Sequence, residues 1–123
     1  MEEIQKIAKK MSKIKGVDAV FLFGSYATGK NNALSDIDLC VFGKLSEKAK
    51  EEVLRFSSEK LDISLFDELP IWIKTRVFRD GKPLINKNEK KIREMVFRTM
   101  HEWEDFKPTL TKLVIERFGK CMT

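Results

Sequence analysis

The chain is poor in the residues that build covalent frameworks and metal–nitrogen sites. Its 123 residues include two cysteines, one histidine and three prolines. The cysteines, Cys40 and Cys121, lie far apart in the sequence, which excludes a disulfide framework and a zinc site of the usual ligand spacing. Cys40 falls in an apolar segment, so we predict a small buried hydrophobic residue there.

Long apolar segments are missing as well. The longest uninterrupted apolar run is Ala19–Phe23, far below the ~20 residues that a membrane-spanning helix needs. The first residues, Met-Glu-Glu-Ile-Gln-Lys, lack the basic and then apolar regions of a signal peptide. We therefore expect a soluble, cytoplasmic protein that does not bind membranes.

Basic residues outnumber acidic ones. Twenty-four Lys and Arg face 19 Asp and Glu, which gives a net charge of +5. This balance suits an anionic partner such as a nucleotide, an RNA or an acidic protein. Solvated lysine-rich helix faces would produce the same surplus, so the charge alone leaves both interpretations open.

Apolar periodicity predicts alternating helices and strands. The pattern indicates helices over 2–15, 46–59 and 69–78, and strands over 17–23, 37–42 and 61–66. Leu84-Ile85 is expected to be a short extended piece after a turn. The fold class is therefore α+β (α/β), a small mixed sheet flanked by helices. We expect a single domain over 1–123, with a core to about residue 85 and a helical extension from about 86 to the end.

The last third of the chain reads as helical. An apolar stripe with helical spacing predicts one long amphipathic helix, carried by Ile92, Met95, Val96, Thr99, Trp103 and Phe106. Pro108 is predicted to end it and to start a final helix, which would bury Leu110, Leu113, Val114 and Phe118.

A Gly-Ser turn follows the first predicted strand. Gly24 allows a backbone with positive φ and a close approach to a ligand, and the amides after it would point at an anion there. Ser25 adds a hydroxyl donor for a phosphate oxygen. Lys30 in the next loop is expected to be solvated. The turn is thus a candidate polyphosphate site, whereas a simple helix cap at Ser25 is the plainer alternative.

Two carboxylates open the second predicted strand. Asp36 and Asp38 project from the same face, roughly 7 Å apart along the strand. Asp62 alternates with apolar neighbours in the third strand, and a carboxylate buried there without a partner would be costly. If the second and third strands are neighbours, three carboxylates converge, which is a donor set that Mg²⁺ prefers.

Several other polar and aromatic residues have plainer interpretations. The single histidine, His101, is expected on a helix surface rather than in acid–base chemistry. Trp72 and Trp103 are expected to be core or interface anchors rather than base-stacking groups. Arg76, Arg79 and Lys82 form a basic patch that could contact phosphate or a partner, although solvation is the plainer interpretation.

Residues 17–66 resemble the minimal nucleotidyltransferases (MNT) of the DNA polymerase β superfamily. The signature of that family is Gly-Ser, ten residues and Asp-x-Asp, and Gly24-Ser25 and Asp36-Ile37-Asp38 match it in residue type and gap. Asp62 matches the third carboxylate by strand position. Thr28 stands where many members carry Arg.

The resemblance implies a nucleotidyltransferase fold and a metal-dependent activity. Two Mg²⁺ ions would be held by Asp36 and Asp38, and one of them also by Asp62. Ser25 and Gly24 would bind the triphosphate, with ATP as the donor of a nucleoside monophosphate. Standalone members resemble antitoxins that modify a HEPN toxin on a hydroxyl group, so a HEPN-type protein is the expected partner.

Other functions remain open at this stage. A noncatalytic module could neutralise a partner by binding alone, and other relatives transfer the nucleotide to a small molecule. The residues do not separate Mg²⁺ from Mn²⁺, because both accept oxygen ligands. A homo-oligomer stays open, and nucleic acid is expected only through the partner.

Overall fold

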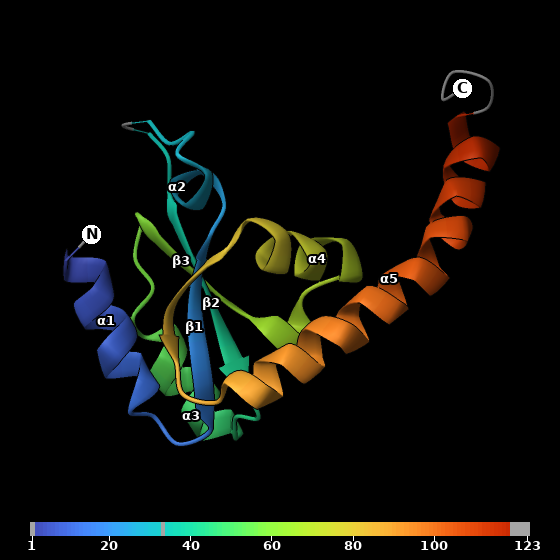
Figure 1. Ribbon diagram of the computed structural model, residues 1–123. Helices are drawn as coiled ribbons and strands as arrows, with labels where there is room; N and C mark the ends of the chain where they lie inside the picture. Colours follow the sequence, from blue (N-terminus) through green and yellow to red (C-terminus); the bar gives the residue numbers. More distant parts are fainter. Residues whose placement is uncertain (1, 33, 119–123) are drawn as a thin grey trace.

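The computed structural model describes residues 2–32 and 34–118. Its helices and strands alternate along most of the chain and then give way to one long helix (Figure 1). The α-helices are α1 (Glu2–Ser12), α2 (Ser25–Thr28), α3 (Glu47–Leu54), α4 (Ile71–Asp80) and α5 (Glu89–Phe118). The strands are β1 (Val17–Phe23), β2 (Ile37–Gly43), β3 (Leu61–Leu65) and β4 (Lys82–Asn86), and the 3-10 helix η1 (Phe66–Glu68) follows β3.

The four strands form a mixed sheet in the order β3-β2-β1-β4. The pair β2 and β3 is parallel, whereas β1 runs antiparallel to β2 and to β4. The end of β1 and the starts of the other three strands therefore meet at one edge of the sheet, the upper edge in Figure 1. This confirms the expected small mixed sheet flanked by helices.

Helices cover both faces of the sheet. Figure 1 shows α1 and α3 on one side and α4 with the first half of α5 on the other. Val20 and Leu22 of β1 pack toward α1 and α3, while Phe21 packs toward α4 and α5. Because both faces are buried, β1 is apolar along most of its length, as expected for a strand without a wet side.

Aromatic rings fill the core on the α4 side. Phe42 stacks on Phe66 with ring centroids 4.4 Å apart, and Phe21 and Phe78 complete the cluster. Cys40 lies in the same core, is fully buried, and has a free thiol, as predicted. Burial raises the pKa of this thiol, so it stays protonated at neutral pH.

The fourth strand was predicted only as a two-residue extended piece. In the structure β4 pairs with β1, and Pro83 lies opposite Phe21. Proline is tolerated here because β4 is an edge strand, where an amide donor on the outer side is not needed. The Gly81-Lys82-Pro83 segment therefore looked like a turn in the sequence, although pairing with β1 stabilises a strand there.

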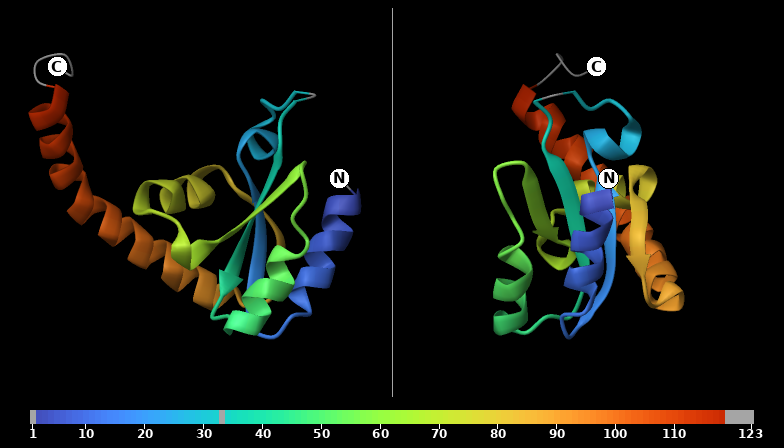
Figure 2. Two further views of the ribbon diagram at one scale, coloured as in Figure 1. Left: turned by 180° about the vertical axis from the view of Figure 1, so that it is seen from behind. Right: turned by 90° about the vertical axis from the view of Figure 1, so that its left-hand side faces the viewer.

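The predicted break at Pro108 is wrong. The helix α5 continues through Pro108, which lies inside it, and Figures 1 and 2 show the helix curving along its length. Proline removes one backbone hydrogen bond and favours a bend, but the turns on either side of it can remain helical. Leu110 is half-buried, and the side chains of Leu113, Val114 and Phe118 lie outside the described residues.

The bounds of three predicted helices also differ from the structure. The helix expected over 2–15 ends at Ser12, and the one expected over 69–78 ends at Asp80. The predicted helix over 46–59 ends at Leu54, where the Ser57 hydroxyl donates to the Leu54 carbonyl, and its start is capped by Ser46 as expected. The helix expected over 69–78 begins at Ile71, because Pro70 is its extended N-cap rather than part of its first turn. Within the described ranges, no helix combines the length and apolar character that a bilayer crossing requires.

Candidate active site

The Gly-Ser turn leaves β1 directly beside the second strand. Phe23 is paired with Asp38, so Gly24 follows at the point where the chain passes the Asp38 side chain. Gly24 has φ 77° and ψ −156°, a backbone that essentially only glycine adopts. A Cβ at this position would stand 2.4 Å from Oδ2 of Asp38. Both the conformation and the contact therefore require glycine.

The third carboxylate lies beside the second. Asp38 and Asp62 are register partners in the parallel pair β2 and β3, so their side chains emerge next to each other on the same face. Leu61 and Ile63, the neighbours of Asp62, are buried on the opposite face. Asp36 lies just before β2 and two residues before Asp38. The alternation of side chains along a strand would therefore place it on the same face as Asp38. The register therefore places Asp38 and Asp62 side by side on the α4 side of the sheet.

The electrostatics agree with this placement. The pKa of Asp38 is raised above its ordinary value, first by burial and then by the negative charges of Asp62 and Asp36. Asp38 is half-buried, whereas Asp36 and Asp62 are exposed. The cluster is therefore a concentration of negative charge that is open to solvent and to a cation.

The described residues contain no group of three or more His, Cys, Asp or Glu that is already arranged to hold a metal ion. Carboxylate oxygens are nevertheless the ligands that Mg²⁺ prefers, and it commonly binds one or two of them together with substrate phosphates and waters. The donor set at Asp36, Asp38 and Asp62 thus suits a cation that arrives with a polyphosphate.

The turn itself forms a short helix, α2. The amides of Ala27 and Thr28 donate to the Gly24 carbonyl, at 3.1 and 3.3 Å. The Thr28 hydroxyl also turns back, toward the carbonyls of Gly24 and Ser25. The Ser25 hydroxyl makes no hydrogen bond with any residue that the structure describes, so it is available to a ligand.

Basic side chains from α4 face this turn. A cavity of about 310 Å³ lies between them, with Gly24 and Thr28 on one side and Arg76 and Arg79 on the other. Sequence reasoning found these arginines but favoured plain solvation for them. The missing information was the position of α4, which no short motif reports.

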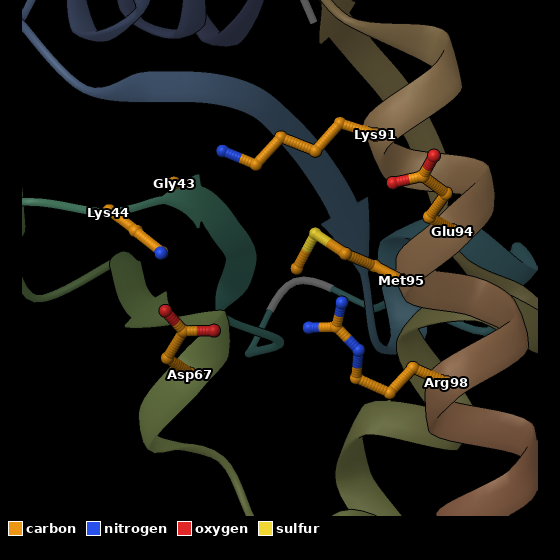
Figure 3. A pocket seen from close by; sticks show the side chains of 7 residues that line it. All are labelled: Gly43, Lys44, Asp67, Lys91, Glu94, Met95 and Arg98. Carbon is orange, nitrogen blue, oxygen red and sulfur yellow. The ribbon is translucent and has the colours of Figure 1, made fainter.

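A second cavity lies at the opposite edge of the sheet. Figure 3 shows the side chains around this space of about 190 Å³, with Lys91 and Arg98 from α5 facing Lys44 and Asp67. Lys91 pairs with Asp18 of β1 at 2.6 Å, so it anchors α5 to the sheet. None of the predicted site residues lines this cavity.

The remaining predictions concern α4 and α5. Trp72 of α4 stacks against Phe106 of α5 at 6.0 Å, so it is an anchor between these helices, as expected, whereas Trp103 contacts the same ring at 6.2 Å from within α5. Trp72 is still 45% exposed. His101 is exposed on α5, which agrees with its predicted surface position.

In this site a Gly-Ser turn contacts a strand that carries carboxylates, on a small mixed sheet. This arrangement defines the nucleotidyltransferase class. The family described as polymerase beta, nucleotidyltransferase, matches residues 2–90. The chain belongs to this family, as the resemblance predicted.

Named relatives agree with the family. A Methanocaldococcus jannaschii protein, provisionally named a protein adenylyltransferase, is 33% identical over 95 residues, which cover 77% of this chain and 74% of that protein. Solved structures share the fold. A chain of a toxin–antitoxin complex with AMP-PNP gives a TM-score of 0.76 at 18% identity, covering 93% of this chain and 98% of that one. A chain of the Shewanella oneidensis complex between a tri-AMPylated HEPN toxin and an MNT antitoxin gives 0.68 at 16% identity, covering 95% and 94%.

Proposed function

We propose that this nucleotidyltransferase moves AMP from ATP to a hydroxyl group of a HEPN-type partner protein and thereby acts as an antitoxin. The observation that carries the proposal is the side-by-side placement of Asp38 and Asp62 with Gly24 against Asp38. The M. jannaschii relative and the toxin–antitoxin structures support the choice of nucleotide and acceptor.

In this proposal, Asp36 and Asp38 would hold Mg²⁺ together with the triphosphate, and Asp62 would lie beside the acceptor. Bound Mg²⁺ would neutralise the phosphates and lower the pKa of the acceptor hydroxyl. The hydroxyl oxygen attacks the α-phosphorus, the bond from that phosphorus to the bridging oxygen breaks, and pyrophosphate leaves. Asp62 accepts the hydroxyl proton. Ser25 and the turn orient the phosphates.

The exposure of the site favours a large acceptor. Asp36 and Asp62 are exposed, so a hydroxyl on the surface of another protein can approach them without entering a deep pocket. The outer half of α5 extends from the body toward the same side of the molecule (Figures 1 and 2). That exposed helix offers additional surface to a partner of protein size.

The test is transfer of label from α-³²P-ATP to a HEPN-type protein from the same genome, with Mg²⁺. We expect label on the partner, none with γ-³²P-ATP, and none after addition of EDTA. Asp38→Asn should abolish the label. If Asp38→Asn neutralises the partner as well as the unmodified chain does, binding alone is sufficient and the catalytic proposal is wrong.

A further inference from the structure

The cavity between α2 and α4 is not explained by the carboxylate cluster. It measures about 310 Å³, and its walls are Phe23, Gly24 and Thr28 on the side of the turn and Ile73, Arg76, Arg79 and Asp80 on the side of α4. None of the three carboxylates lines it. It is therefore a separate space whose walls carry two arginines and one carboxylate, Asp80, and it lies next to a site with three carboxylates.

Gly24 lies between the cavity and the carboxylate cluster. It lines the cavity, and it is also the residue whose Cβ would collide with the Asp38 carboxylate. In the proposed reaction the α-phosphorus lies at the carboxylates, where the bond changes occur. The β- and γ-phosphates extend from the α-phosphorus, and the cavity beyond Gly24 is an adjoining space that contains arginine side chains.

The charge in the cavity comes from α4 and not from the turn. The Thr28 hydroxyl is directed at carbonyls of its own turn. Arg79 is paired with Asp80 at 3.1 Å. The pKa of Asp80, which also lines the cavity, is lowered first by the hydrogen bond from Arg79 and also by the charges of Arg79, Lys30 and Arg76, so all three cations act on one carboxylate. Arg76 makes no ion pair within the described part of the chain, which leaves its guanidinium available to an anion.

We infer that Arg76 binds the β- and γ-phosphates of the nucleoside triphosphate in the cavity between α4 and the Gly24–Thr28 turn. The inference rests on the proposed function, because that reaction fixes where the α-phosphorus lies. A guanidinium suits this position, since its planar donors can bind two phosphate oxygens at once. Arg79, held by Asp80, supports the local charge without needing to contact the ligand.

A binding measurement with a non-transferable nucleotide tests the inference. The unmodified chain, Arg76→Gln and Arg76→Lys are titrated by calorimetry in Mg²⁺ with α,β-methylene-ATP, with AMP and with inorganic tripolyphosphate. The matched control is Arg55→Gln, which removes the same charge from an exposed position beside α3, on the opposite face of the sheet.

We expect Arg76→Gln to weaken binding of α,β-methylene-ATP and of tripolyphosphate by about 10- to 100-fold. AMP binding should stay within about twofold, because AMP has no β- or γ-phosphate. Arg76→Lys should restore part of the affinity, and Arg55→Gln should match the unmodified chain. The melting temperature of Arg76→Gln should not change, because Arg76 is exposed.

Equal losses for AMP and for the triphosphate, or no loss for either, would overturn the inference. If the unmodified chain transfers label to its partner while Arg76→Gln keeps the same KM for ATP, only the role of Arg76 is wrong. If the unmodified chain binds none of these nucleotides, the proposed function fails and the inference fails with it.

Discussion

Gly24 and Asp38 are in such close contact that a methyl group on the glycine would lie 2.4 Å from Oδ2 of the carboxylate. Gly24→Ala should therefore destabilise the fold by about 1–3 kcal/mol, because alanine is strained at this backbone conformation. It should also displace Asp38 and reduce AMP transfer by about 100-fold or more. Urea denaturation and label transfer measure the two effects.

Gly29→Ala is the matched control for that substitution. Gly29 also has a positive φ of 75°, but a Cβ there would meet nothing within 4 Å. Its left-handed conformation should cost about 1–2 kcal/mol of stability, with transfer unchanged at temperatures where the protein is folded. If Gly29→Ala loses as much transfer as Gly24→Ala, the contact with Asp38 is not the cause.

Asp38→Asn should stabilise the ligand-free protein while abolishing transfer. The pKa of Asp38 is raised, first by burial and then by Asp62 and Asp36, so its charged form is disfavoured in the folded state. The stability that protonated Asp38 contributes is fully present below the pKa that Asp38 has in the unfolded chain. It is lost as the pH rises through the raised pKa that Asp38 has in the folded protein.

At pH 7 removal of this charge should therefore raise the melting temperature, and the difference from the unmodified chain should shrink as the pH falls toward 3.8, the ordinary value. Thermal melts across this pH range measure it. Asp105→Asn, on an exposed position of α5, makes the same chemical change and should leave the melting temperature as it was. A lower melting temperature for Asp38→Asn at pH 7 would contradict the assignment.

Cys40 should be inert until the protein unfolds. Its side chain is fully buried in the core between the sheet and α4, and burial raises the pKa of its thiol. In a Cys121→Ser background Cys40 is the sole thiol. Alkylation by iodoacetamide should be slower by about 1,000-fold or more in buffer than in urea. Mass spectrometry follows the reaction, and rapid labelling in buffer would show that the thiol is accessible.

Pro108→Ala should stabilise the outer half of α5 locally. Proline has no amide hydrogen to donate to the carbonyl of Glu104, so alanine restores one backbone hydrogen bond. Lys107, Thr109 and Lys112 are exposed, so this segment adds little to the core. We expect slower amide hydrogen exchange around residue 108 and an unchanged melting temperature. A large rise in melting temperature would mean that the outer half unfolds together with the sheet.

Local sequence signals were sufficient to predict where most residues of the candidate site lie in the fold. The gap between Gly24-Ser25 and Asp36 identified the turn and the first carboxylates, and alternation alone placed Asp62 on the face opposite Leu61 and Ile63. These signals work because the two-residue period of a strand fixes the direction of each side chain without knowledge of the rest of the fold.

Features set by tertiary contacts were not predictable in this way. The strand β4 contains Pro83 and became recognisable only through its pairing with β1. The helix α5 continues past Pro108, although local propensity favours a break. The position of Arg76 opposite Gly24 depends on how α4 packs on the sheet, and no short-range pattern encodes that packing.

The solvent exposure of Asp36 and Asp62 has a kinetic consequence. Water can reach the same place as the acceptor, so an idle enzyme should slowly hydrolyse ATP to AMP and pyrophosphate. Selectivity for one acceptor hydroxyl then cannot come from enclosure of the site. Under the proposed function it would come from how long a docked protein keeps that hydroxyl in place and shields the nucleotide from bulk solvent.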